Sequence, residues 1–594
     1  MTAATGAGPN GRSPDKVSTL AAAVETHVRP GDVVHVAYAD ARPNAALHQL
    51  VRRFAGRPAG LTLVTAGLVS SQHALVELGV LDRLVASFAG ENLPAPRPNR
   101  AFQRAVREGR IEVESWSLWS LTARLMAAAL GVPHLPVRSL AGSDLGAALH
   151  GRGFAEVADP FGGPPSGVVA ALRPDVVLLH GVAADRAGNV VLSAPYGEGA
   201  WGALAARRGA IASVERIVDT ETIREHAALV RVPAHAVLAV CEVPLGSHPY
   251  GLFNPGLDGV AGYVPDEEFM AEVVRASNDP AEFRRWIDEW LLGTADHDAY
   301  LAKLGPNRIA ALRAQAEEDG WRSTLTAAAD PPDRWTDAEA MVVTAARRIA
   351  GRVRKQDFDA VLAGVGQANL ASWLAVTGLQ AVGADVELMA EIGMFGYRPR
   401  PGEPFIFAHR NLPTCALLTD VATVLGAFVG GPATRSLGVI GAGQVDADGN
   451  TNSTYAEDGS YIVGSGGAND IATSAEEVLV TVAHGSHRLV RRVPYVTSPG
   501  HGVRTVVSTA GVLERVDGRF VATAFVARSG ESDAEAVERL RAGCGWDLDI
   551  ARDVAREPDP TSAELSALRR YDPARTFLGR LHGKADGDAS VRAR

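Results

Sequence analysis

The chain has 594 residues, of which 46% are apolar and 21% are charged, and its formal net charge is −10. This length exceeds what one ordinary hydrophobic core organises, so we expect at least two globular domains. The acidic balance argues against a nucleic-acid-binding protein, which needs a basic surface to hold phosphates.

The first half of the chain begins with a lead-in over residues 1–16 that is rich in Ala, Gly, Pro and Ser, a composition for which we expect disorder. It lacks the apolar core of a signal peptide. Apolar strands then alternate with helical segments, which predicts an α/β domain with parallel strands. The segment 121–130 is apolar but too short to cross a membrane, and it predicts a buried helix. We assign helices over 17–30 and 44–54, and strands or apolar segments over 32–38, 61–66, 82–88 and 174–181.

The second half follows a helical, charged region over 266–315 and a connector over 318–335 that contains Pro331-Pro332-Asp333. We place the domain boundary in this connector. A helix over 337–354, a strand over 359–362 and a Gly-rich turn then open the second domain.

The two halves resemble each other in sequence. Each has a helix, a strand and a second helix with an Asn near its start, and each places a turn of Asp, Gly and Asn after a strand, at 185–189 and at 446–450. This weak repeat predicts two related α/β domains in tandem. The interface between them is where we expect the active site.

Glu391 is the leading candidate for catalysis. The run 386–396 predicts a strand that ends at Glu391, and Ile392-Gly393 lets the chain turn sharply there. A carboxylate in a cleft could attack an activated acyl group. The alternative is an acidic side chain at a strand end that faces water.

A Gly-rich loop over 464–470 follows a predicted strand over 461–463 and precedes a helical run from about 470 to 477. Its glycines let backbone N–H groups approach a ligand closely, as an oxyanion or a phosphate requires. The alternative is a tight connection between a strand and a helix. The segment 495–501, which we expect to end a strand, and His248 have the same two interpretations, a ligand contact or a structural role.

Several chemistries are disfavoured by the sequence. The segment 439–446 begins like a dinucleotide-binding fingerprint, but Asp446 replaces its third small residue and a turn follows where a helix should begin. The chain has no H-E-x-x-H, P-loop or G-x-S-x-G motif. Cys241, Cys415 and Cys544 form no C-x-x-C pair, which fits a reducing cytoplasm. We therefore expect no metal site and no permanently bound cofactor.

A set of ordered motifs resembles the family I CoA-transferases, most closely the glutaconate CoA-transferase type with α-like and β-like subunits fused. The β-like motifs are 390–393, 443–446, 449–454, 464–469 and 495–500, and the α-like motifs are 127–133, 135–137, 246–249, 296–301 and 303–305. The resemblance covers most of residues 17–580. It implies two related open α/β domains of the NagB/RpiA/CoA-transferase-like fold in tandem, an α-like domain over 17–317, a linker over 318–335, a β-like domain over 336–580 and a flexible tail over 581–594.

The resemblance also implies a mechanism in which Glu391 forms an acyl-glutamyl anhydride and then a glutamyl-CoA thioester. A coenzyme A thioester is a substrate in it. By analogy, the oxyanion and CoA contacts are Gly464, Gly466, Gly467, Ala468, Asn469, Gln444 and Asn450, and the acyl pocket contains Tyr38, Asp40, Arg42, Ser87, Phe88, Asn92 and His248.

Two positions depart from the family pattern. Ile392-Gly393 stands where Ser-Gly or Asn-Gly is common, and Ala37-Tyr38-Ala39-Asp40 stands where the α-like half usually has Gly-Gly-Phe, so substrate choice is expected to differ.

Three functions remain open at this point. The first is CoA transfer between carboxylates by a cytoplasmic homo-oligomer that binds neither nucleic acid nor membrane. The second is a lyase, decarboxylase or hydrolase acting on a CoA thioester with the same scaffold. The third is a non-catalytic acyl-CoA-binding protein.

Overall fold

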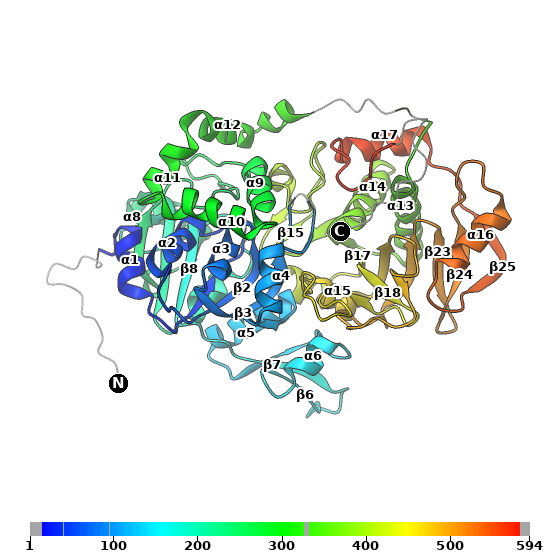
Figure 1. The fold of residues 1–594 in the computed structure, drawn as a ribbon, viewed down its shortest axis with the longest axis horizontal. Coiled ribbons are helices and arrows are strands. Elements are labelled where there is room, and N and C mark those ends of the chain that lie inside the picture. Colours follow the sequence, from blue (N-terminus) through cyan, green and yellow to red (C-terminus); the bar gives the residue numbers. More distant parts are fainter. Residues whose placement is uncertain (1–14, 40, 94, 326–330, 332, 582–594) are drawn as a thin grey trace.

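The computed structural model describes residues 15–39, 41–93, 95–325, 331 and 333–581. The predicted lead-in and tail lie outside the described residues except for Asp15, Lys16 and Leu581. Two α/β units, each with its own large sheet, lie side by side, with the first half of the chain on the left of Figure 1 and the second half on the right. The prediction of two α/β domains in tandem is confirmed.

The first sheet has nine strands, and β1 (Val33–Val36) lies near its centre with parallel neighbours β2 (Leu61–Val69) and β8 (Val176–Asp185). Continuous burial of β8 explains why its sequence is an uninterrupted apolar run. The other strands are β3 (Leu81–Gly90), β4 (Glu112–Ser115), β9 (Val190–Leu192), β10 (Gly209–Val218), β11 (Val230–Val232) and β12 (Val237–Glu242).

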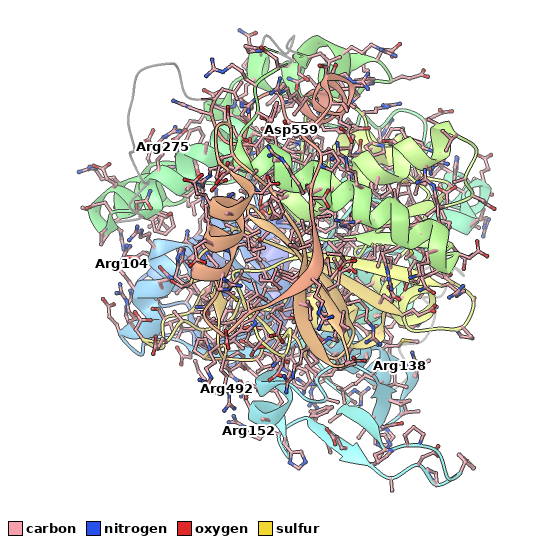
Figure 2. All side chains as sticks on the ribbon, turned by 90° about the vertical axis from the view of Figure 1, so that its right-hand side faces the viewer. Arg104, Arg138, Arg152, Arg275, Arg492 and Asp559 are labelled. Atoms are coloured by element: carbon pink, nitrogen blue, oxygen red, sulfur yellow. The ribbon has the colours of Figure 1, made fainter. Side chains whose placement is uncertain are left out.

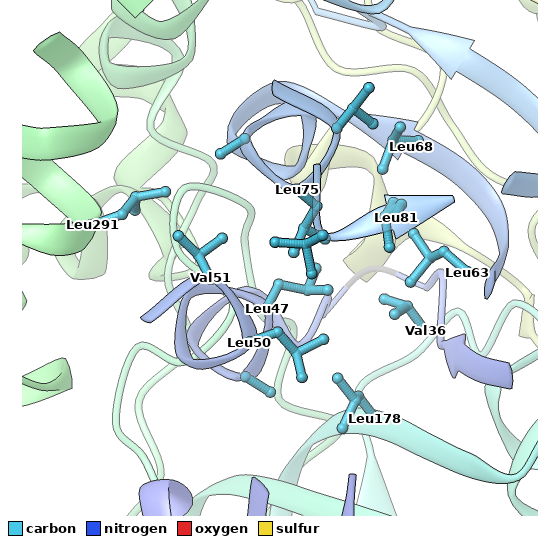
Figure 3. Close-up of a cluster of buried hydrophobic side chains, with 14 of the residues drawn as sticks. Val36, Leu47, Leu50, Val51, Leu63, Leu68, Leu75, Leu81, Leu178 and Leu291 are labelled. Atoms are coloured by element: carbon cyan, nitrogen blue, oxygen red, sulfur yellow. The ribbon is translucent and has the colours of Figure 1, made fainter. Parts of the chain in front are cut away.

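Helix α2 (Asn44–Phe54) illustrates how the first core forms. Leu47, Leu50 and Val51 follow one another at helical spacing, so they share one face and are buried. This face packs beside Val36 and Leu178 of the sheet, as Figure 3 shows. Burying each Leu side chain contributes about 2 kcal/mol. Further helices of this half are α1 (Leu20–His27), α3 (Ala74–Glu77), α4 (Arg100–Arg107), α5 (Leu118–Leu130), α6 (Asp144–Leu149), α7 (Gly199–Ala205) and α8 (Thr220–Glu225).

A small three-stranded sheet of β5 (His134–Val137), β6 (Phe154–Val157) and β7 (Ser166–Ala170) lies below the first half in Figure 1. The predicted helical region after residue 266 is present and covers the upper side of this half. It consists of α9 (Glu267–Ser277), α10 (Pro280–Ile287), α11 (His297–Leu304) and α12 (Pro306–Ala316).

The second sheet has ten strands, with β13 (Ala360–Ala363) between β14 (Glu387–Ala390) and β17 (Ser436–Gly441). Its remaining strands are β15 (Met394–Phe395), β16 (Leu417–Leu418), β20 (Glu477–Val482), β22 (Val503–Ser508), β23 (Gly511–Val516), β24 (Arg519–Phe525) and β25 (Asp549–Arg556). The helices of this half are α13 (Asp337–Gln356), α14 (Gln367–Ala381), α15 (Ala468–Ser474), α16 (Asp533–Ala542), α17 (Ser562–Tyr571) and the π-helix η7 (Ala422–Val429). Beside the sheet lie the short strands β18 (Gln444–Asp446), β19 (Thr451–Asn452) and β21 (Leu489–Val490).

The repeat seen in the sequence is present in the structure. In each half a strand is flanked by two parallel neighbours, β1 by β2 and β8, and β13 by β14 and β17. The two Asp-Gly-Asn turns also correspond, since Asn189 Nδ2 donates to Asp185 at 2.9 Å and Asn450 Nδ2 donates to Asp446 at 3.1 Å.

Two predicted strands are absent from the described structure. Residues 461–463 form no regular strand; Ile462 N and Val463 N donate to the Thr454 and Ser453 carbonyls, and the Val463 carbonyl accepts from Ala89 N, at the end of β3 in the other half. Residues 495–498 likewise exchange hydrogen bonds with Asp144 of the first half through Val496. Both segments serve the contact between the halves instead of extending the second sheet. Across the described ranges, no helix has the length and apolar character needed to span a membrane.

Candidate active site

Glu391 lies in the turn that follows β14, as the sequence predicts. Gly393 has a φ of +124°, and a Cβ atom there would lie 2.1 Å from the Thr419 carbonyl oxygen, so only glycine fits this turn. Ile392 is buried and anchors the turn, while Glu391 itself is partly exposed. The carboxylate therefore lies at the C-terminal end of β14, and the tight turn fixes its position.

The Gly-rich loop lies directly against this carboxylate. A Cβ atom on Gly467 would lie 1.9 Å from Glu391 Oε2, and one on Gly466 would lie 4.0 Å from Oε1. The backbone of the loop can approach this closely because neither residue has a side chain. The loop and the strand end, predicted separately, thus form one site.

Glu391 titrates near neutral pH in this environment. Burial raises the pKa of its carboxyl to about 7, the charge of Asp470 adds to the rise, and the backbone amide of Gly467 opposes it. Burial likewise raises the pKa of Asp470 to about 6. A shifted carboxyl in a site between domains is typical of a reacting group.

The N-terminal turn of α15 fastens the two halves together beside Glu391. Asp470 accepts hydrogen bonds from Ser117 Oγ at 2.5 Å and Ser139 Oγ at 2.6 Å, both in the first half. Asn469 Oδ1 accepts from Leu140 N at 2.8 Å, also in the first half. The Gly-rich loop adds backbone contacts, because Gly466 N donates to the Ser87 carbonyl at 2.9 Å and Gly464 forms a bridge with Phe88.

These contacts give the predicted loop residues different surroundings. Gly466 and Gly467 lie beside the Glu391 carboxylate. The other loop residues contact the first half, Gly464 through Phe88 and Asn469 through Leu140, and Ser87 accepts from Gly466 N. Ala468 begins α15.

Four residues of the first half form an aromatic cluster around a guanidinium group. The Arg42 guanidinium carbon lies 4.0 Å from the centre of the Tyr38 ring and 3.5 Å from that of Tyr250. Asn92 links the two phenols, donating towards Tyr38 Oη at 3.4 Å and accepting from Tyr250 Oη at 3.0 Å. We call Tyr38, Arg42, Asn92 and Tyr250 the tyrosine–arginine cluster. Asp40, predicted for the same pocket, lies outside the described residues.

The tyrosine–arginine cluster adjoins the Glu391 turn. Tyr38 and Ile392 belong to one buried apolar cluster. Glu198 Oε1 accepts from Tyr38 N at 3.0 Å, and its neighbour Gly197 donates to the Ile392 carbonyl at 3.2 Å. Burial raises the pKa of the Tyr38 phenol, the Arg42 charge opposes the rise and Glu391 adds to it, so both charges act on this ring.

Three predicted site residues use their side chains in hydrogen bonds to residues other than Glu391 and the Gly-rich loop. His248 contacts Tyr300 Oη at 2.6 Å and Asp266 at 3.1 Å through its two ring nitrogens. Asn450 closes its turn and accepts from Gly500 N at 2.8 Å. Gln444 accepts from Asn452 at 3.1 Å. Their roles in ligand binding stay predictions.

Sequence reasoning missed Asp470, Glu198, Ser139 and Tyr250. Asp470 is the last residue of the Gly-rich loop over 464–470 and Tyr250 directly follows the motif 246–249, but nothing local shows that their side chains face the site. Among the described residues, no group of three or more His, Cys, Asp or Glu side chains could hold a metal ion.

Comparisons with known proteins agree on one family. A family model described as coenzyme A transferase matches residues 17–242. The chain is 32% identical over 294 residues to one of the two subunits of 3-oxoadipate CoA-transferase from Pseudomonas knackmussii, covering 49% of this chain and 98% of that protein. It is 27% identical over 271 residues to the other of these subunits, covering 42% of this chain and 97% of that protein.

A solved acyl-CoA transferase from E. coli O157:H7 matches 97% of this chain and 99% of its own, with a TM-score of 0.64 and 14% identity, which shows a shared fold. The near-complete coverage of the 32% identical relative, together with the shared fold, identifies this chain as a member of the coenzyme A transferase family.

Proposed function

We propose that this enzyme moves CoA between an acyl-CoA and a carboxylic acid, with Glu391 as the nucleophile. The observation that carries this proposal is the placement of the Glu391 carboxylate against the Gly466–Gly467 backbone, at the contact between the halves. A nucleophile needs an exposed lone pair, and an acyl-transfer site needs N–H donors where negative charge develops. The partly exposed Glu391 side chain and the Gly467 backbone N–H beside it support these two requirements.

The proposed exchange has two covalent stages. The Glu391 carboxylate attacks the thioester carbonyl, a C–O bond forms and the C–S bond breaks, which gives an acyl-glutamyl anhydride and free CoA thiolate. The thiolate attacks the glutamyl carbonyl and expels the donor acid as a carboxylate, which leaves a glutamyl-CoA thioester. An acceptor carboxylate then reverses both steps, so the cycle consumes and releases no net proton.

Splitting the reaction suits a carboxylate, which is a weak nucleophile. The developing oxyanion would lie near the backbone N–H groups of the Gly-rich loop, and one such donor typically contributes about 3 kcal/mol to transition-state stabilisation. Retention of CoA by contacts away from the thioester keeps the thiolate in place for the second step. We assign these contacts to residues around the loop, and the acyl pocket to the tyrosine–arginine cluster.

Intact-protein mass spectrometry after incubation with a panel of acyl-CoAs tests the proposal. Wild-type protein should gain a CoA-sized adduct that maps to the peptide containing Glu391, and Glu391→Gln should gain none. Glu387→Gln is the matched control, because Glu387 begins the strand that leads to Glu391 but pairs with Arg398 at 2.6 Å. This control variant should form the adduct as the wild type does.

Consumption of acyl-CoA without any adduct, and without an acceptor acid, would instead assign the site to hydrolysis or decarboxylation. Binding without turnover, indifferent to Glu391→Gln, would indicate an acyl-CoA-binding protein. Adduct formation at another residue would remove Glu391 from the role.

A further inference from the structure

A short segment of the first half binds the main chain of the turn that carries Glu391. Gly197 N donates to the Ile392 carbonyl at 3.2 Å, and Ile392 is the residue after Glu391. Tyr196 N donates to the Thr419 carbonyl at 2.8 Å. Thr419 lies on the far side of the same turn, since its own N donates into the turn at 2.8 Å. Two consecutive amides of the first half therefore hold the turn from both sides.

Glu198 attaches this segment to β1. Its Oε1 atom accepts from Tyr38 N at 3.0 Å and lies 3.3 Å from His35 Nε2. His35 belongs to β1, and Tyr38 follows the end of that strand by two residues. Gly197 has a φ of +56°, and a Cβ atom there would lie 1.8 Å from the Tyr38 carbonyl oxygen, so the two main chains lie directly against each other. One side chain thus joins β1 to the segment that binds the Glu391 turn.

The Glu198 side chain is directed inward although the residue lies at the start of a helix. It directly precedes α7, where an acidic side chain can accept from the first helix amides, but it makes no such bond. Glu198 is only 1% exposed, in contrast to Asp559, whose side chain lies at the surface in Figure 2. Its side chain serves the contact with β1 instead of the helix.

The contact between Glu198 and His35 contributes little to stability. Among the described residues, Glu198 Oε2 and His35 Nδ1 are buried and have no hydrogen-bond partner. Leaving buried polar atoms unpaired is unfavourable, and apolar side chains of similar volume are often at least as stable as a buried pair of ionisable groups. The pair instead provides a fixed direction, because His35 is itself held in place. A Cβ atom on Gly202 of α7 would lie 2.1 Å from His35 Nδ1, so the ring packs tightly against that helix.

We propose that Glu198 is a positioning residue, which keeps the Gly197 amide on the Ile392 carbonyl and thereby holds the Glu391 carboxylate against the Gly-rich loop. This inference rests on the proposed CoA-transfer function. Gly467 lies beside the carboxylate, whereas the first-half segment holds the main chain behind it. A reacting group must lie about 3–3.5 Å from its target, and a displacement of about 1 Å typically lowers the rate about 100-fold. Loss of the Glu198 contact should therefore slow the chemistry more than it weakens substrate binding.

Three substitutions of Glu198 separate position from charge, with the rate of Glu391 adduct formation at saturating acyl-CoA followed by quenched-flow mass spectrometry. Because Oε1 makes both contacts of Glu198, Glu198→Gln keeps them, and its rate should lie within about fivefold of wild type. Glu198→Asp keeps the acidic group but withdraws it by one methylene, and Glu198→Met keeps the length without an oxygen acceptor. Both should slow adduct formation about 100-fold.

Two further readouts distinguish positioning from a general loss of structure. In a Glu391→Gln background, isothermal titration should give acyl-CoA affinities within about threefold of one another for all Glu198 variants, because the loss falls on the chemical step. The midpoint of the pH–rate profile should stay at its wild-type value, since the burial and the Asp470 charge that raise the Glu391 pKa are unchanged. Trp201→Phe is the matched control. It removes the hydrogen bond from Trp201 Nε1 to Asp420 at 3.2 Å, which α7 makes just after the same segment, and it should leave the rate within about threefold of wild type.

Hydrogen exchange tests the contact without any chemistry. The Gly197 amide should exchange about tenfold faster or more in Glu198→Met and Glu198→Asp than in wild type and Glu198→Gln, because its bond to the Ile392 carbonyl is no longer held. Mass spectrometry of the peptide containing Gly197 measures this rate.

Adduct formation in Glu198→Met at the wild-type rate would overturn the inference, as would equal losses in Glu198→Gln and Glu198→Asp or an equal loss in Trp201→Phe. If Glu198→Met does not fold, the comparison of Glu198→Gln with Glu198→Asp decides. Absence of any adduct in the wild type would overturn CoA transfer instead. Faster exchange of the Gly197 amide in Glu198→Asp would then still support the hold of Glu198 on this contact.

Discussion

Glu391 and its neighbours show how a few atoms define the chemistry of the site. Burial and the nearby Asp470 charge favour the protonated carboxyl, while the Gly467 amide favours the ionised one. The pKa therefore lies where a small change in environment alters how much nucleophile is present. The glycines matter for a different reason, because they leave space for the carboxylate.

The pH dependence of turnover follows from the Glu391 pKa of about 7. Only the ionised carboxylate attacks, so kcat/KM for an acyl-CoA should rise about tenfold per pH unit below this value and level off above it. Stopped-flow or steady-state rates between pH 5.5 and 8.5 measure this, and Glu387→Gln should give the same profile. A profile that falls with rising pH over this range would contradict an ionised nucleophile.

Gly467→Ala should nearly abolish adduct formation. The added Cβ atom would lie 1.9 Å from Glu391 Oε2, so the carboxylate or the loop must move, and misplacement of about 1 Å typically costs about 100-fold in rate. Gly378→Ala is the control, because that helical position has no atom within 4 Å of the new Cβ. Mass spectrometry of both variants with one acyl-CoA decides the matter; an adduct yield in Gly467→Ala equal to wild type would show that the loop adapts.

At the scale of elements, the segment 461–470 connects local sequence to the contact between the halves. Its apolar residues 461–463 have strand character, yet they hydrogen-bond to the end of β3 in the other half. An extended segment can form backbone hydrogen bonds with any extended neighbour, and the tertiary fold determines which neighbour that is. Because residues 461–463 lead directly into the Gly-rich loop and α15, their contact with the other half also positions that loop beside Glu391.

Asp470→Asn tests this element and its electrostatic role together. Removing the like charge should lower the Glu391 pKa and move the pH–rate midpoint to lower pH, although burial keeps it above the usual range. The variant should also lose about 1–3 kcal/mol of stability, since hydrogen bonds from Ser117 and Ser139 to a charged acceptor are weakened. Asp298→Asn removes an exposed charge in the other half and serves as the control. An unchanged midpoint in Asp470→Asn would show that its charge does not act on Glu391.

At the scale of the whole molecule, the candidate active site lies where the two halves meet. The carboxylate and the Gly-rich loop come from the second half, whereas the tyrosine–arginine cluster comes from the first. Hydrogen bonds through Asp470, Asn469 and Gly466 cross between them. The 3-oxoadipate CoA-transferase relatives that match 49% and 42% of this chain are two separate subunits.

Cutting the connector should therefore leave the enzyme assembled. A protease site inserted within the predicted linker 318–335 breaks one covalent connection but none of the crossing hydrogen bonds. After cleavage, the two fragments should co-elute in size-exclusion chromatography and keep most of the acyl-CoA turnover of the uncut chain. Separate elution of two fragments would mean that the covalent linkage itself maintains the interface.

Much of this organisation could be predicted from the sequence, because it depends on neighbouring residues. Apolar spacing predicts the helix over 44–54, and glycines after Glu391 and around residue 466 predict a sharp turn and an open loop. The repeat of Asp-Gly-Asn turns predicts two similar halves. These features follow from local backbone freedom and from periods of two and 3.6 residues.

The contacts that give the site its chemistry could not be predicted in this way. Gly467 lies against Glu391, Asp470 accepts a hydrogen bond from Ser139, and Arg42 stacks on Tyr250, although the partners in each pair are distant in the chain. Sequence alone determined most of the helices and strands of the two large sheets and which carboxylate follows a strand. Only the tertiary structure decided which groups share one low-dielectric site, because burial and the Coulomb interactions that shift a pKa depend on distance in space and not on separation along the chain.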